Sequence, residues 1–129
     1  MAFAALTSTR GTCSRLEVGA IAAKDGRVLS SGYNGAPTGL DHCVHDEEGV
    51  PCRRAIHAEA NAIAFAAKHG VSLEGATVYI THSPCFSCAQ LMINSGIVRI
   101  VYSHLYRDTS PLELLAEAGI TVEQIENLV

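Results

Sequence analysis

The sequence predicts an α/β fold, a three-layer α/β/α sandwich around a mixed five-stranded sheet. Three observations lead to it: two apolar segments joined by Asp-Gly, three more apolar segments farther along, and helix-forming stretches between them. Helices between strands imply crossover connections, which favour a largely parallel sheet covered on both faces. The expected order is two strands followed by three helix–strand pairs.

The first two strands are expected at residues 18–23 and 27–33, on either side of Asp25-Gly26. Asp-Gly is a strong signal for a tight turn between antiparallel strands, so these segments predict a β-hairpin. Residues 32–52 are rich in Gly, Pro, His and Cys and predict a long functional loop.

A buried helix is expected at residues 55–69, which lack Gly and Pro and are rich in Ala. Apolar residues recur there at helical spacing before Gly70 ends the segment. Strand and helix patterns then alternate to the end of the chain. The expected strands are 76–81, 98–103 and 120–122, and the expected helices are 85–94 and 111–118.

The length of 129 residues suits one hydrophobic core, so we expect a single domain over residues 1–129. Apolar residues make up 48% and charged residues 17%, which is a globular balance. No apolar run approaches the roughly 20 residues of a membrane span, and the first residues lack the basic segment of a secretory signal. We therefore expect a cytoplasmic protein with no membrane partner.

The charge and the cysteines narrow the class of partner. A formal net charge of −4, without blocks of Lys or Arg, argues against a nucleic-acid polymer, whose binding depends on neutralising phosphates. A small-molecule substrate fits better. The five cysteines are an odd number without a secretory signal, which favours reduced thiolates for metal binding over disulfides.

Two short motifs carry the chemistry. His57 and Glu59 stand near the expected start of one helix, and Cys85 and Cys88 begin the next. One imidazole and two thiolates leave the fourth position of a tetrahedral Zn²⁺ open, as in catalytic zinc sites. Zinc lowers the pKa of a bound water from about 15.7 to about 7. Glu59 would accept the water proton and pass it to the substrate's ring nitrogen and leaving amine.

Each motif alone has an ordinary interpretation. A lone Cys-x-x-Cys is as often a redox motif or a structural zinc motif as a catalytic one. A lone His-x-Glu is usually a pair on a helix surface. Together with Pro84 they form the H-x-E…P-C-x-x-C signature of zinc nucleobase deaminases. The stretch between Glu59 and Pro84 is long enough for one helix and one strand, which brings both motifs to one pocket.

Beyond these motifs, the chain resembles the deoxycytidylate (dCMP) deaminase family, within the cytidine deaminase-like fold, over nearly its whole length. The specific segments are residues 32–35, Gly-Tyr-Asn-Gly, and residues 42–43, His-Cys, because many deaminases share the zinc motif. The other matching positions are residues 8–9, 13–15, 18–20, 36–37, 39, 57–63, 79–81, 83–85, 88–89, 102 and 106.

The resemblance implies conversion of dCMP to dUMP with release of ammonia, a hydrolase reaction of pyrimidine deoxynucleotide metabolism, with Zn²⁺ as cofactor. Asn34 would match the family asparagine that bonds the sugar hydroxyl. The guanidinium groups of Arg15 and Arg107 would suit a dianionic phosphate, because each can form two parallel hydrogen bonds to it. The alternative for both residues is a solvated charge on the surface. The expected substrate-binding residues are Asn34, Arg15, Ala58, Ser83, Tyr106 and Arg107.

Other activities stay open. Riboflavin-pathway deaminases usually have many more residues between their two cysteines, and tRNA adenosine deaminases act on a polyanion that an acidic chain binds poorly. A deaminase of another cytosine nucleotide or nucleoside, such as dCTP or cytidine, remains an alternative. A non-catalytic zinc-stabilised binding module is a further alternative, but it would have no use for Glu59.

The remaining cysteines raise the question of a second metal. Some dCMP deaminases hold a structural zinc at positions matching Cys13 and Cys43, and Cys52 with His45 or His42 would complete a closed site. Such a site would fix the long loop to the hairpin. The alternative is that these cysteines are small buried hydrophobic residues.

The resemblance also bears on the first residues and on assembly. The segment before Ser8 is short, so the family's usual first helix is expected to be abbreviated. The resemblance further implies a homo-oligomer, a hexamer or smaller, and dCTP and dTTP as candidate effectors.

Overall fold

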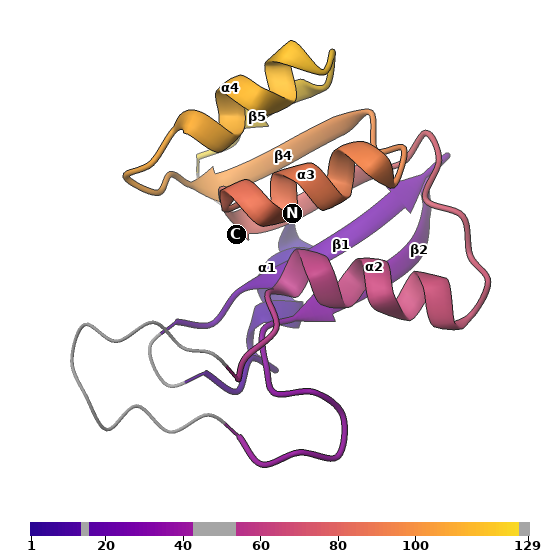
Figure 1. Cartoon of the computed structure of the whole chain (residues 1–129), viewed down its shortest axis with the longest axis vertical. Coiled ribbons are helices and arrows are strands. Elements are labelled where there is room, and N and C mark those ends of the chain that lie inside the picture. The colour runs from indigo at the N-terminus through magenta and orange to yellow at the C-terminus, as the bar shows by residue number, and fades with distance from the viewer. Residues whose placement is uncertain (14–15, 43–53, 127–129) are drawn as a thin grey trace.

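The computed structural model describes residues 1–13, 16–42 and 54–126, in which helices alternate with strands (Figure 1). No helix of these residues is long and apolar enough to cross a membrane. The elements are α1 (Ala2–Ser8), β1 (Gly19–Lys24), β2 (Arg27–Tyr33), α2 (Ala58–Lys68), β3 (Thr77–His82), α3 (Phe86–Asn94), β4 (Arg99–His104), α4 (Ser110–Glu117) and β5 (Thr121–Gln124).

The strands form one mixed sheet in the order β2-β1-β3-β4-β5. β1 pairs antiparallel with β2 and β3, whereas β4 pairs parallel with β3 and β5. The five-stranded mixed sheet predicted from the sequence is confirmed. The helical crossovers make β2, β3, β4 and β5 run in one direction, and the hairpin inserts the opposite strand β1 between β2 and β3.

The hairpin turns at Asp25-Gly26, as predicted. Both residues have positive φ, 53° and 73°. A two-residue turn of type I′ requires positive φ at both central positions, which Asp and Gly tolerate better than other residues. The turn thereby sets the pairing of Lys24 with Arg27 at the start of the hairpin.

Helices cover both faces of the sheet, which gives the predicted three layers. On β1, the Cα of Gly19 faces the backbone of Ala4 and Ser8 in α1. The next residue, Ala20, points to the opposite face and belongs to the core shared with α2, α3 and α4. α1 therefore lies on one face, while α2, α3 and α4 lie on the other (Figure 1).

Helix α2 begins later than the sequence pattern predicted, at Ala58 instead of residue 55. Ile56 exchanges both backbone hydrogen bonds with Gly35, at 2.7 and 3.2 Å, so it is held extended and unavailable to the helix. The side chain of Asn61 in α2 donates to the carbonyl oxygen of Tyr33 at 2.8 Å. These contacts fix the first turn of α2 against the end of β2.

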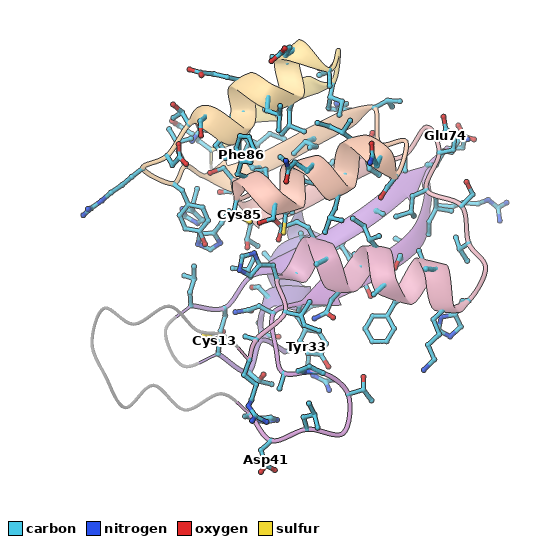
Figure 2. All side chains as sticks on the ribbon, in the orientation of Figure 1. Cys13, Tyr33, Asp41, Glu74, Cys85 and Phe86 are labelled. Carbon is cyan, nitrogen blue, oxygen red and sulfur yellow. The ribbon has the colours of Figure 1, made fainter. Side chains whose placement is uncertain are left out.

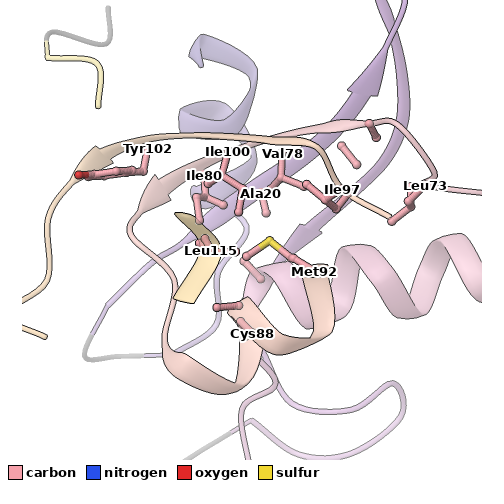
Figure 3. Close-up of a cluster of buried hydrophobic side chains, with 14 of the residues drawn as sticks. Ala20, Leu73, Val78, Ile80, Cys88, Met92, Ile97, Ile100, Tyr102 and Leu115 are labelled. Carbon is pink, nitrogen blue, oxygen red and sulfur yellow. The ribbon is translucent and has the colours of Figure 1, made fainter. Parts of the chain in front are cut away.

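The main core lies between the sheet and the three helices of its larger layer (Figure 3). Ile80 of β3 and Ile100 of β4 are fully buried, and Met92 of α3 and Leu115 of α4 pack over them without exposed surface. Each side chain of this size contributes about 1.5–3 kcal/mol when it is removed from water. This packing holds α3 rigidly on the sheet beside α2.

Gly32 allows α2 to approach the hairpin. A Cβ atom at this position would overlap the carbonyl oxygen of Ala58 and lie 2.5 Å from the backbone nitrogen of Ala62. Both atoms belong to the first turns of α2, so no flexible side chain could move aside. The absence of a side chain at Gly32 therefore allows the first turns of α2 to pack this closely against β2.

We expect Gly32→Ala to destabilise the protein by about 1–3 kcal/mol, since the methyl group forces the backbone of α2 away from β2. Urea denaturation measures the free energy of unfolding directly. Ser31→Ala, at the exposed neighbouring position, is the control and should change it by less than about 0.5 kcal/mol. Equal stability of the two variants would contradict this close approach.

Candidate metal centre

The starts of two helices meet beside the end of β3. His57 precedes α2 and Cys85 precedes α3, and both have extended backbones, with φ/ψ of −66°/152° and −75°/171°. An extended residue at this position directs its side chain beyond the helix end. Figure 2 shows Cys85 at the start of α3, near the N-terminal end of α2.

His57, Cys85 and Cys88 form a cluster whose ligand atoms all lie within 4.8 Å of one another. Nδ1 of His57 is 3.3 Å from Sγ of Cys85 and 3.4 Å from Sγ of Cys88. Bond lengths of about 2.0 Å to nitrogen and 2.3 Å to sulfur place N and S about 3.5 Å apart around tetrahedral zinc. The cluster therefore fits Zn²⁺, with Nδ1 as the histidine ligand atom.

The thiol groups of Cys85 and Cys88 have pKa values shifted in opposite directions. A hydrogen bond from Cys88, with help from His57, lowers the pKa of Cys85 to about 3. The same interaction with Cys85, together with burial, raises the pKa of Cys88. The protein thus favours ionisation of Cys85 over that of Cys88, and a bound cation would favour ionisation of both thiols.

Glu59 lies in the first turn of α2 with only 5% of its surface exposed. Burial raises the pKa of this carboxyl group to about 7, although its own backbone N–H and His57 oppose the shift. It does not belong to the ligand cluster. A carboxyl group that titrates near neutral pH is suited to both accepting and donating a proton.

A cavity of about 170 Å³ opens onto this cluster. Four of the predicted substrate-binding residues, Asn34, Ala58, Ser83 and Tyr106, line it. Arg107 is exposed next to Tyr106 and is not part of the lining formed by the described residues, and Arg15 lies outside them. The lining comprises Cys13, Leu16, Val18, Asn34, Ala55, His57, Ala58, Glu59, His82, Ser83, Cys85 and Tyr106.

Asn34 shapes the wall of the cavity through its amide group. Its Oδ1 accepts a hydrogen bond from the N–H of Val18 at 2.8 Å, and its Nδ2 donates to the carbonyl oxygen of Leu16 at 2.6 Å. A side-chain amide can make four hydrogen bonds, so one acceptor site and one donor site are left over by the described residues and can serve a ligand. Asn34 can therefore hold the segment of Leu16 and Val18 in place and bind a ligand at the same time.

Ala58 and Ser83 offer backbone and hydroxyl groups at the cavity. Ala58 is the first residue of α2, so its N–H has no acceptor within the helix. Ser83 donates its N–H to the carbonyl oxygen of His104 at 2.8 Å, and its hydroxyl oxygen accepts from the N–H of Tyr106 at 2.9 Å. Ser83 thus fixes the segment that carries Tyr106 over the cavity.

The pKa of Tyr106 is raised to about 12 by burial and by the negative charge of Glu59. Its hydroxyl group therefore stays protonated at neutral pH and can donate a hydrogen bond. The ring stacks on His82, which the sequence analysis did not single out. His82 directly follows the predicted strand 76–81 and precedes Ser83-Pro84, and this position could have indicated that it faces the site.

The second zinc stays a prediction. Cys13 lines the cavity, whereas Cys43, His45 and Cys52 lie outside the described residues. In the part of the chain that the structure describes, His57, Cys85 and Cys88 are the one group of three candidate ligands.

The comparisons with known proteins agree with this geometry. The model of the cytidine and deoxycytidylate deaminase zinc-binding region matches residues 1–104. ComE operon protein 2 of Bacillus subtilis is 44% identical, over 98% of this chain and 69% of its own. Deoxycytidylate deaminase of Enterobacteria phage T4 is 34% identical, over 91% of this chain and 83% of its own.

A solved structure is similar over almost the whole fold. It is the dCMP deaminase of cyanophage S-TIM5 in complex with dCMP and dUMP, with a TM-score of 0.89 and 35% identity. The match covers 95% of this chain and 91% of that chain. These matches confirm the predicted cytidine deaminase-like fold, and the zinc-binding region with its ligand cluster confirms Zn²⁺ as the cofactor. The chain belongs to the cytidine and deoxycytidylate deaminase family.

Proposed function

We propose that this chain is a zinc-dependent hydrolase that converts dCMP and water to dUMP and ammonia. The observation that carries the proposal is the spacing of one imidazole and two sulfur atoms around a site for tetrahedral zinc, beside the buried carboxyl group of Glu59. Relatives named as deoxycytidylate deaminases, and the solved complex of one of them with dCMP and dUMP, support the choice of substrate.

His57, Cys85 and Cys88 would hold the zinc and leave one coordination position open. When bound, the ion supplies a Lewis acid that makes water nucleophilic near pH 7. Glu59 then carries the proton: it accepts one from the attacking water and donates it to the ring nitrogen of cytosine. The same carboxyl group would then take the second proton of that water from the hydroxyl group now bonded to C4 and pass it to the amine. The C4–N bond breaks, ammonia departs, the C4 carbonyl of dUMP forms and the carboxylate is restored.

Other cavity residues would orient the nucleotide. The N–H of Ala58, which has no acceptor within its own helix, is suited to the carbonyl oxygen of the base, because helix N-termini favour partial negative charge. The free donor and acceptor positions of Asn34 are suited to the sugar hydroxyl. Arg15 and Arg107 are proposed as candidates for the phosphate, where a guanidinium can form two charge-assisted hydrogen bonds.

Assembly and regulation form a further part of the proposal. The side chains of Phe3 and Leu6 in α1 are 55% and 67% exposed, and a homo-oligomer, a hexamer or smaller, would cover such apolar surface. dCTP and dTTP are proposed as effectors by the family resemblance. A second, structural zinc on Cys13, Cys43 and Cys52 is proposed on the same ground.

Location in the cytoplasm is also proposed. The support comes from the reduced cysteines that a His-Cys-Cys zinc centre needs, since thiolates persist in reducing compartments.

The first test compares substrates. Purified protein should deaminate dCMP with a higher kcat/KM than dCTP, cytidine or deoxycytidine, because only dCMP fits the base, sugar and single phosphate together. Ammonia release measures all four reactions under one condition. A higher kcat/KM for dCTP or cytidine would favour the alternative activity, and no ammonia from any of them would favour a zinc-stabilised binding module.

The second test removes the proton carrier. Glu59→Gln should lower kcat by about 10² to 10⁴, the usual effect of losing an acid–base group, while zinc content and melting temperature stay close to wild type. Glu117→Gln, an exposed position on α4, is the matched control and should leave kcat unchanged. Near-normal turnover by Glu59→Gln would remove this carboxyl group from the mechanism.

A further inference from the structure

Three aromatic side chains gather where β3 and β4 end. The ring centroid of His82 lies 4.9 Å from that of His104 and 5.5 Å from that of Tyr106, with angles of 32° and 25° between the ring planes. His82 and Tyr106 line the cavity, whereas His104 is exposed and outside the lining that the described residues form. The two neighbouring rings restrict the orientation of the His82 imidazole.

A hydrogen-bond chain favours one tautomer of the His82 ring. Oγ1 of the buried Thr81 accepts from the N–H of Gly19 at 3.2 Å and lies 2.8 Å from Nδ1 of His82. Donation of the Thr81 hydroxyl proton to Nδ1 satisfies the buried hydroxyl group. Nδ1 is then an acceptor, and the proton of the neutral ring sits on Nε2.

Burial and the nearby His104 lower the pKa of His82, which keeps this ring neutral near pH 7. With Nδ1 occupied as an acceptor, the remaining polar group is the Nε2–H donor. The neighbouring Tyr106 also offers a donor, because its hydroxyl group stays protonated. Arg107, the next residue in the chain, carries further donors and a positive charge.

His82 and Tyr106 therefore bring two hydrogen-bond donors to the cavity lining, and Arg107 follows Tyr106 in the chain. The base and sugar of a nucleotide need both donors and acceptors, whereas a phosphate dianion has acceptor oxygens. A group with only acceptors is the natural partner for a set of donors. Glu59 and Cys85, at the metal cluster where the base must react, help to raise the pKa of Tyr106 and so keep its hydroxyl group a donor.

We propose that His82 is a specificity-determining residue that binds the 5′-phosphate of the substrate through its Nε2–H. The assignment rests on the proposed function, because a phosphate is present only if the substrate is a nucleotide. Zinc binding and proton transfer do not depend on His82. The residue should therefore favour dCMP over deoxycytidine without taking part in the chemical step.

His82→Phe tests this, since it keeps an aromatic ring in the stack and removes the donor. We expect kcat/KM for dCMP to fall by about tenfold to a hundredfold, the range for a hydrogen bond to a charged group, mainly through KM. The value for deoxycytidine should stay within about twofold. His69→Phe makes the same change at an exposed position beyond the end of α2, outside the cavity lining and away from His82, and should leave the ratio of the two values unchanged.

A second pair of variants distinguishes the loss of a phosphate contact from partial misfolding of the variant. The ratio of kcat/KM for dCMP to that for deoxycytidine, measured on one sample, does not depend on how much of the protein is folded. His82→Gln keeps an N–H donor and should retain more of this ratio than His82→Leu, which has none.

The outcomes separate this inference from the proposed function. An unchanged ratio in His82→Phe, or equal ratios in His82→Gln and His82→Leu, would overturn the phosphate assignment while dCMP deamination by the wild type still stood. A wild-type protein that does not deaminate dCMP would refute the proposed function and the assignment together.

Discussion

The first turns of α2 and α3 must meet for this site to exist. β2 and β3 run in the same direction, and each is followed by one of these helices on the same face of the sheet, so both helices begin at one edge. The residue before each helix is extended, which turns His57 and Cys85 toward each other. The ligand cluster, the position of Glu59 and the cavity all follow from this convergence.

The convergence also brings together one carboxyl and two thiol groups, whose ionised forms repel one another when no cation is bound. Burial raises the pKa of Glu59 to about 7, and the hydrogen bond between the two thiol groups lowers the pKa of Cys85 while raising that of Cys88. Buried ionisable groups of like charge oppose one another's ionisation. A divalent ion held by His57, Cys85 and Cys88 would remove this conflict, because it would favour both thiols as thiolates and leave the carboxyl group of Glu59 free to exchange protons.

The sequence predicted the layers, the mixed sheet and the ligand cluster, because these depend on local periodicity and on a motif with fixed chemistry. It could not place the start of α2, since the bridge between Gly35 and Ile56 joins residues distant in sequence. It also missed His82, whose role depends on packing against Tyr106 from another strand connection. Such contacts leave no periodic pattern, so they become visible only when the chain is folded.

Anomalous diffraction from crystals of the protein, at the zinc absorption edge, tests the central claim most directly because it locates each metal ion separately. The account predicts a peak between Nδ1 of His57 and the sulfur atoms of Cys85 and Cys88, with the fourth ligand a water molecule or a bound nucleotide. No peak at that point, or a fourth ligand from the protein itself, would contradict a catalytic zinc centre.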